Sequence, residues 1–213
     1  MIAWRFVGDA ALCLEVEAPM PLDANVLVHR LAARLRAHRV PGVRDIVPSM
    51  TSVTIHLDPL RVDLSAVETV VASLSDGCTE DADAARQHEV PVKYGGAWGP
   101  DLDDVSRAAG LTTAEVVARH TAVPYRVCFL GFLPGFAYLG LVHEALRMPR
   151  RATPRTRVAG GSVGIADVFT GVYPADSPGG WHILGHTDVA LFDVTWPEPS
   201  RFRPGDLVQF VEA

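Results

Sequence analysis

Five arginines lie close together in the second half of the chain, and no acidic residue separates them. They are Arg147, Arg150, Arg151, Arg155 and Arg157. Two prolines between them restrict the backbone. A guanidinium group binds a carboxylate or a phosphate through two parallel hydrogen bonds. Because the whole chain carries a net charge of −6, this segment is a local positive site. We expect it to bind an anionic ligand or an acidic partner, and a solvated basic loop is the alternative.

Two turn-forming segments follow the arginines. Gly160, Gly161 and Ser162 open an apolar strand, and backbone of this kind can approach a ligand closely and present N–H groups to an anion. The second segment carries several functional side chains on turn-forming backbone: Tyr173, Asp176, Ser177, Gly179, Gly180 and Trp181. Asp176 and Ser177 could serve in acid–base chemistry or in phosphate contacts, and Trp181 could form the wall of a pocket. The alternative is a β-turn with local side-chain caps.

Metal and triad chemistry have little support in the sequence. His182 and His186 are four residues apart, but no third ligand stands at a metal-binding spacing. We therefore predict no metal site. The chain has no G-x-S-x-G motif and no cysteine–histidine arrangement that its spacing supports, so a triad hydrolase is not predicted.

An apolar and aromatic block covers residues 129–140 and includes Pro134 and Phe136. Its glycines permit close chain crossings. Its prolines and aromatic rings are typical of a pocket wall or a subunit interface. A strand in the protein core is an equally good interpretation.

Composition excludes several classes of protein. The chain has 213 residues, of which 48% are hydrophobic and 21% charged, so we expect a folded protein. The acidic balance argues against nucleic-acid binding, and the longest uncharged run, 127–142, is too short to span a membrane. Three separated cysteines indicate a reducing compartment, so we expect a cytoplasmic location.

The pattern of predicted secondary structure changes near residue 88, from mixed strands and helices to mainly strands. For residues 1–86 the patterns predict strands at 3–7, 11–16, 45–48 and 52–57, a helix capped by Asp23, and a helix at 64–74 capped by Asp63 or Ser65. The order ββαββα indicates an α+β domain of ferredoxin-like type. Residues 75–88 are predicted to form a linker or an exposed loop.

For residues 87–213 the sequence predicts a mainly-β domain. Short apolar runs at 90–94, 125–132, 162–165, 181–184, 189–192 and 207–211 alternate with proline and glycine turns, which favours a closed barrel. Residues 101–121 predict two helices that meet at Gly110. The second of these helices carries only Glu115 and Arg119 as charges, too few for a DNA-reading helix, so the pair is predicted to be structural.

Several long segments in order resemble one family. They are GFLPGFAYLGL, MPRRATPRTRV, GGSVGIA, TGVYPADSPGGWHILGHT and RPGDLVQF. Together they resemble the family known as the B-type subunit of 5-oxoprolinase, allophanate hydrolase subunit 1 or kinase-A inhibitor (KipI-like). The resemblance runs from about Val90 to Val211 and implies a cyclophilin-like barrel for the second domain.

The resemblance also implies a function. It implies a subunit of an ATP-dependent amide (lactam) hydrolase, a 5-oxoprolinase that opens 5-oxoproline to L-glutamate with Mg-bound ATP as co-substrate. The implied partners are a second carboxyltransferase-like subunit, of the allophanate hydrolase subunit 2 type or the 5-oxoprolinase C type, and a third TIM-barrel-like subunit. Alternatives are a regulatory inhibitor of a histidine kinase and a subunit for allophanate- or urea-related amide or carboxyl-transfer chemistry. Prolyl isomerisation has only the fold analogy in its favour.

Side-chain chemistry and motif position give a set of expected site residues. The expected catalytic residues are Arg155, Asp176, Ser177 and His186. The expected substrate- and nucleotide-binding residues are Arg150, Arg151, Arg157, Gly160, Gly161, Ser162, Tyr173, Gly179, Gly180, Trp181, Pro134 and Phe136. Two departures from the family pattern bear on substrate preference: Phe169 replaces a common glutamine, and His186 replaces a common arginine.

Overall fold

The computed structural model describes residues 2–73 and 85–213, which belong to two compact units, Met1–Ala84 and Ala85–Ala213. The sequence-based boundary lies two residues further along the chain. Arg86 belongs with the second unit, because its carbonyl oxygen accepts from Leu207 N and its guanidinium group binds the carboxylate of Asp206.

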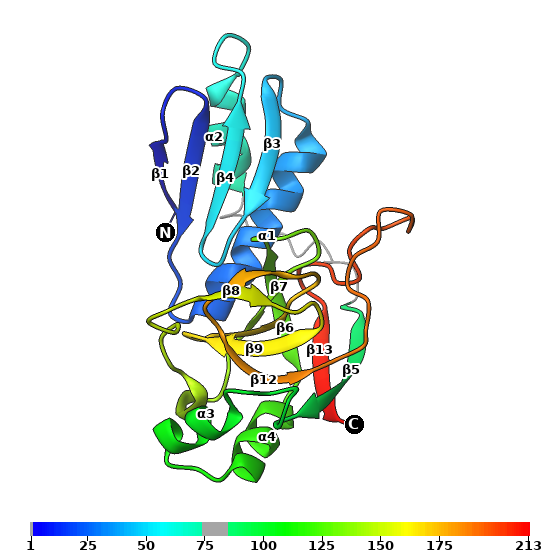
Figure 1. Cartoon of the computed structure of the whole chain (residues 1–213). Coiled ribbons are helices and arrows are strands. Elements are labelled where there is room, and N and C mark those ends of the chain that lie inside the picture. The colour runs from blue at the N-terminus through cyan, green and yellow to red at the C-terminus, as the bar shows by residue number, and fades with distance from the viewer. Residues whose placement is uncertain (1, 74–84) are drawn as a thin grey trace. The chain divides into compact units, whose positions relative to one another are not determined.

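The first unit is a four-stranded antiparallel sheet with two helices (Figure 1). Its strands β1 (Ile2–Phe6), β2 (Ala11–Val16), β3 (Val43–Pro48) and β4 (Ser52–Leu57) stand in the order β1-β2-β4-β3. One apolar core joins alternate residues of β2 and β4 to α1 (Pro21–His38) and α2 (Leu64–Ala72). The predicted element order ββαββα is therefore present. The ferredoxin-like type is not confirmed, because that fold has the order βαββαβ.

Of the two N-terminal helix caps predicted in this unit, one is confirmed and one is wrong. Asp63 caps α2, because its carboxylate accepts from the N–H groups of Ser65 and Ala66. The predicted cap at Asp23 is wrong, because α1 begins at Pro21 and Asp23 lies inside the first turn. Proline suits the first helical position, and a carboxylate in the first turn is favoured by the helix dipole.

The predicted linker lies only partly within the described residues. Leu74 and residues 75–84 lie outside them. At the other end, Gln87 and His88 already belong to β5 (Gln87–Tyr94) and pair with β13 (Leu207–Glu212). The strand therefore begins before the polar stretch ends.

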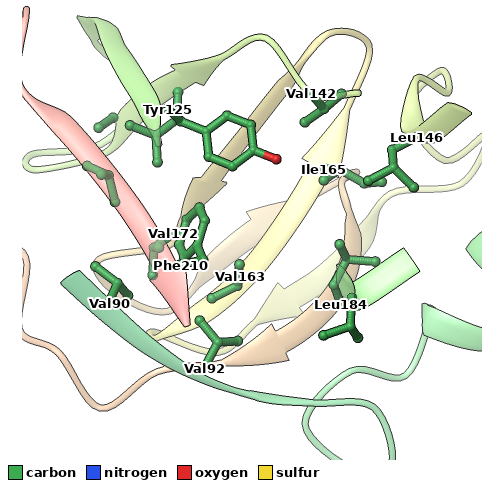
Figure 2. Close-up of a cluster of buried hydrophobic side chains, with 14 of the residues drawn as sticks. Val90, Val92, Tyr125, Val142, Leu146, Val163, Ile165, Val172, Leu184 and Phe210 are labelled. Carbon is green, nitrogen blue, oxygen red and sulfur yellow. The ribbon is translucent and has the colours of Figure 1, made fainter. Parts of the chain in front are cut away.

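The second unit is a closed seven-stranded barrel, as predicted, and is consistent with a cyclophilin-like fold. The strand order around the barrel is β10 (Phe169–Val172), β7 (Ala137–Gly140), β6 (Tyr125–Leu130), β13, β5, β12 (His182–His186) and β9 (Ser162–Ala166). Pairing of β9 with β10 closes the barrel. Figure 2 shows how side chains of these strands, among them Val92, Ile165 and Phe210, converge on the interior.

A small sheet and three short helices accompany the barrel strands among the described residues. Strands β8 (Arg155–Val158) and β11 (Ser177–Gly179) form a separate two-stranded sheet. Helices α3 (Leu102–Ala109) and α4 (Thr113–Thr121) lie together (Figure 1). The predicted helical pair is confirmed: Gly110 ends α3 with a positive φ of 67°, and Thr112 and Glu115 form a capping box for α4. A short 3-10 helix, η2 (Glu144–Leu146), follows β7.

The apolar run at 189–192 forms no strand of the barrel. Only an isolated bridge joins Phe192 to Ser200. The strand before this segment, β12, already has β5 and β9 on its two edges. The barrel therefore closes without the 189–192 segment, and its apolar residue Leu191 is buried from a loop.

A neutral histidine lies in the barrel core. His120 is fully buried on α4, where its Nδ1 lies 2.7 Å from the Tyr94 hydroxyl and its Nε2 lies 2.8 Å from the Thr170 hydroxyl. Thr170 donates its own proton to Gly164 O, so it accepts from His120 Nε2. Burial lowers the pKa of His120 to about 3.

This burial predicts a loss of stability in mild acid. The imidazole protonates near pH 6.5 in the unfolded chain and only near pH 3 in the folded chain, so its contribution is present at neutral pH and is lost as the pH falls between these values. From pH 7 to pH 5 the free energy of unfolding should fall by about 2 kcal/mol through this group. Urea titrations of the wild type and of His120→Gln at pH 7 and pH 5 measure this fall in the free energy of unfolding. The glutamine can make both hydrogen bonds without titrating, so an equal fall in both proteins would contradict the prediction.

Candidate functional site

The centre of the candidate site is a carboxylate that the sequence analysis did not single out. Asp101 stands directly before α3, and its side chain is only 2% exposed. Arg151 Nη1 and Arg155 Nη2 each donate to its Oδ1 at 2.7 Å. Arg155 Nη1 donates to Oδ2 at 2.9 Å, and the backbone N–H of Ile183 donates to the same oxygen at 2.7 Å. Two of the predicted arginines therefore meet on one buried group.

The charge of this cluster follows from its hydrogen bonds. Burial on its own raises the pKa of the Asp101 carboxyl, but the hydrogen bonds from Arg155 and from Ile183 N outweigh it and hold the pKa below its usual value. The same contact raises the pKa of Arg155. One carboxylate and two guanidinium groups leave the cluster with one excess positive charge.

Two further predicted arginines keep most of their surface exposed. The Arg150 side chain is 62% exposed, with Nε 3.8 Å from a carboxylate oxygen of Asp167. The Arg157 side chain is 78% exposed and donates from Nε to Asp176 Oδ2 at 2.8 Å. Pairs this exposed are screened by water and hold a guanidinium group weakly. Both arginines remain accessible to an anion from solution.

The glycine-rich turn uses its own N–H groups internally. Gly160 N donates to Asp176 Oδ1 at 2.9 Å, Gly161 N to Tyr173 O at 2.7 Å, and Ser162 N to Ala159 O at 3.2 Å. These three donors are thus already engaged. Glycine is required at 161 for a different reason: its φ is +83°, and a Cβ there would lie 2.4 Å from the carbonyl oxygen of Thr187.

The predicted catalytic residues Asp176 and Ser177 have different surroundings: Asp176 accepts hydrogen bonds from its neighbours, whereas the Ser177 hydroxyl is buried. The N–H of Gly160 and then the guanidinium group of Arg157 hold the pKa of Asp176 below its usual value. The Ser177 hydroxyl oxygen is buried and has no hydrogen-bond partner among the described residues. The two side chains therefore share no hydrogen-bonded network within that part of the chain.

His186 connects the glycine turn to an exposed tryptophan. Its Nε2 lies 3.1 Å from Gly160 O, which only accepts, so Nε2 carries the proton. Its ring lies 5.0 Å from the half-exposed ring of Trp98. Its Nδ1 is buried, finds no hydrogen-bond partner in residues 2–73 and 85–213, and lies 3.7 Å from the nearer carboxylate oxygen of Asp188. The other histidine of the pair, His182, contacts Pro149 O through Nε2.

An aromatic cluster lies beside the arginines. Phe136, Tyr173 and Trp181 are buried and meet edge to face, with ring centres 5.3 Å apart for Phe136–Trp181 and 5.4 Å for Phe136–Tyr173. Burial raises the pKa of Tyr173, which keeps its phenol protonated. Phe132 extends the cluster to the surface, where it is 58% exposed at a φ of 71° that is rare for a bulky side chain.

The remaining predicted residues line these features. A Cβ at Gly179 would lie 2.5 Å from the Tyr173 hydroxyl, so the glycine permits the close packing of that ring. Gly180 lies beside Arg150 and Pro154, and its carbonyl oxygen accepts from Arg151 N. Pro134 lies in the exposed turn that carries Phe132.

Two neighbours of the site, Trp98 and Asp101, were not predicted from the sequence. Both belong to the stretch GGAWGPD at 95–101, which packs against β12: Gly95 N donates to Leu184 O, and Asp101 N to Ile183 O. Three glycines beside a tryptophan and an aspartate are the pattern that could have drawn attention to it. Among residues 2–73 and 85–213, no group of three or more histidine, cysteine or carboxylate side chains could hold a metal ion, and no helix is long and apolar enough to cross a membrane.

Comparison with known proteins defines the class. The family model for the carboxyltransferase domain, subdomain C and D, matches residues 2–202. The chain is 44% identical to the B-type subunit of 5-oxoprolinase from Escherichia coli O157:H7, with 96% of this chain and 93% of the relative covered. It is 37% identical to the B-type subunit of 5-oxoprolinase from Bacillus subtilis, covering 96% and 90%. The chain therefore belongs to the 5-oxoprolinase B-type family of carboxyltransferase-domain proteins, and the resemblance found in the sequence is confirmed.

Solved structures show the same fold, in two cases within longer chains. The crystal structure of TTHA0988 matches with a TM-score of 0.81 at 37% identity, covering 96% of this chain and 40% of that one. A conserved uncharacterized protein from Pyrococcus horikoshii matches with a TM-score of 0.58 at 35% identity, covering 99% and 97%. The Kluyveromyces lactis urea amidolyase, at 18% identity and a TM-score of 0.81, shares the fold over 15% of its length.

Proposed function

We propose that this chain is a subunit of an ATP-dependent 5-oxoprolinase complex that opens 5-oxoproline to L-glutamate. The observation that carries the proposal is the 44% identity to a relative named as the B-type subunit of 5-oxoprolinase, over nearly the full length of both chains. The acidic, apolar-rich chain with a positive site also fits a cytoplasmic enzyme subunit that binds an anionic small molecule.

The arginines and the aromatic cluster suit such a reaction. The lactam oxygen would take the γ-phosphoryl group of ATP as ADP leaves. Water would then add to the activated carbon, and the ring C–N bond would break to leave a protonated amine and an acyl phosphate. A second water would hydrolyse the acyl phosphate to the carboxylate and phosphate. Negative charge on phosphoryl and carboxylate oxygens is stabilised by fixed guanidinium groups. Arg151 and Arg155, which Asp101 holds in place, provide these groups, and the more exposed Arg150 and Arg157 add further positive charge. Tyr173 and Trp181 provide an apolar wall beside Arg150 and Arg155.

Partner subunits are part of the proposal. The word "subunit" in the names of the relatives supports a heteromeric complex. The longer TTHA0988 chain joins this fold to further sequence. We propose a second carboxyltransferase-like subunit and a third TIM-barrel-like subunit as the partners that complete the enzyme.

The substrate is tested by a direct comparison. The chain is co-expressed with these two partners, and glutamate release from 5-oxoproline is measured beside ammonia release from allophanate, each with and without this chain. We expect glutamate release that requires ATP and this chain, and no ammonia release. Ammonia from allophanate, with no glutamate from 5-oxoproline, would reject the proposed substrate.

We propose a structural contribution for Asp176 within this site. Its pKa is lowered by Gly160 N–H and by Arg157, so it is ionised at neutral pH and poorly suited to proton transfer. Asp176→Asn should therefore reduce kcat less than about tenfold, whereas loss of a general acid or base costs about 100-fold or more. Asp104→Asn, another exposed aspartate in an ion pair, is the matched control. A 100-fold loss in folded Asp176→Asn alone would show that Asp176 transfers a proton.

A further inference from the structure

The carboxylate of Asp101 does not cap the helix that follows it. Asp101 occupies the N-cap position of α3, where an aspartate side chain normally accepts from the first backbone N–H groups of the helix. Its side chain makes no such bond to α3. The carboxylate instead accepts four hydrogen bonds from Arg151, Arg155 and Ile183, which fill its acceptor sites. Helix α3 therefore has no side-chain cap from Asp101. The carboxylate instead connects the segments that carry Arg151, Arg155 and Ile183.

The two arginines would otherwise repel each other. Their guanidinium groups meet on the same oxygen, Oδ1 of Asp101, and each contact is 2.7 Å long. The loop before β8 is fixed as well, because Arg151 N donates to Gly180 O at 2.8 Å. The pair is therefore held in one geometry by a charge that is itself inaccessible to solvent.

The cluster retains capacity for an anion. Each guanidinium group has five N–H donors, and Asp101 takes two from Arg155 and one from Arg151. Arg151 Nε is buried without a hydrogen-bond partner among the described residues. An unpaired buried donor is costly, so a site of this kind is completed by a ligand or by water. The side chains of both arginines remain about one-third exposed, which leaves an approach from solution.

We propose that Asp101 is a positioning residue, which presets Arg151 and Arg155 as an anion-binding pair for the phosphoryl or carboxylate oxygens of a ligand. The pair itself touches the ligand, and Asp101 acts through it. Identification of that ligand with ATP or with 5-oxoproline rests on the proposed function. The anion-binding property of the pair does not.

The test is therefore made by binding as well as by kinetics. Isothermal titration of the full chain with inorganic tripolyphosphate and, separately, with 5-oxoproline distinguishes phosphoryl from carboxylate recognition. The variants are Asp101→Asn, Asp101→Glu and the matched control Asp103→Asn, an exposed acidic residue on the same helix. Near-UV circular dichroism establishes that each variant is folded.

We expect the wild type and Asp103→Asn to bind one of the two probes equally, and Asp101→Asn to bind it at least tenfold more weakly. Asp101→Glu keeps the charge and should recover part of the affinity; it replaces Asp101→Asn in the comparison if the latter does not fold. In the assembled complex the same variants should raise the KM for the matching substrate more than they lower kcat.

Unchanged affinity and KM in a folded Asp101 variant, or no binding of either probe by the wild type, would overturn the inference. A complex without turnover whose chain binds the probe in an Asp101-dependent way would reject only the proposed function.

Discussion

Arg155→Met is expected to abolish 5-oxoproline-dependent turnover, by about 100-fold or more, and also to lower the free energy of unfolding by about 3–5 kcal/mol. The loss of activity follows from removal of a fixed cation. The loss of stability follows because Asp101, whose side chain is 2% exposed, would lose its two hydrogen bonds from Arg155 and keep only one cationic partner. Steady-state kinetics of the assembled complex and urea denaturation of the chain measure the two effects separately.

A second substitution separates the two losses. In Asp101→Asn/Arg155→Met the buried charge is gone, so much of the stability should return while the activity should not. If the double variant recovered wild-type turnover, Arg155 would have only a structural role. If the single variant were as stable as the wild type, the account of a buried carboxylate that needs its arginines would be wrong.

Gly161→Ala is expected to produce the second large effect, a loss of about 3 kcal/mol or more in unfolding free energy. Position 161 has a φ of +83°, and a Cβ would lie 2.4 Å from Thr187 O and 2.5 Å from His186 Nε2. Both the strain and the clash act on the end of β12, so His186 should lose its contact with Gly160. Urea denaturation and the chemical shifts of the His186 ring report these changes.

The neighbouring glycine provides the matched control. Gly160 has no positive φ, and a Cβ there would lie 3.1 Å from Ala175 Cα, a tight but adjustable contact. Gly160→Ala should therefore stay within about 1 kcal/mol of the wild type, since alanine also reduces the entropy of the unfolded chain. Equal losses in the two variants would contradict the view that backbone geometry, rather than general crowding, requires Gly161.

Local patterns predicted the elements whose determinants lie within a few residues. The glycine end of α3 and the Asp63 cap of α2 are both contacts between near neighbours in sequence. The closed barrel was also predictable from the spacing of apolar runs and turns. The short strands β8, β10 and β11 were not, because each has three or four residues and is defined by its partner strand rather than by its own pattern.

The candidate site was predicted in its residue types but not in its connections. The arginine segment pointed to anion binding, yet its acidic partner Asp101 lies 50 residues earlier than Arg151 and looks in sequence like an ordinary helix cap. Similarly, the glycine turn suggested free N–H donors, and only the fold shows that Asp176, Tyr173 and Ala159 already accept from them. Contacts between distant segments decide both cases, and a single sequence does not contain them.

The most direct test of the account is joint quantification of ADP and glutamate formed from 5-oxoproline by the assembled complex. We predict one ADP for each glutamate with the wild-type chain, and neither product with the Asp101→Asn/Arg155→Met chain in a complex of unchanged subunit composition. Wild-type turnover by the complex that carries the double variant, or glutamate formed without ADP, would contradict the claim that this barrel unit contributes its arginine pair to an ATP-dependent opening of the lactam.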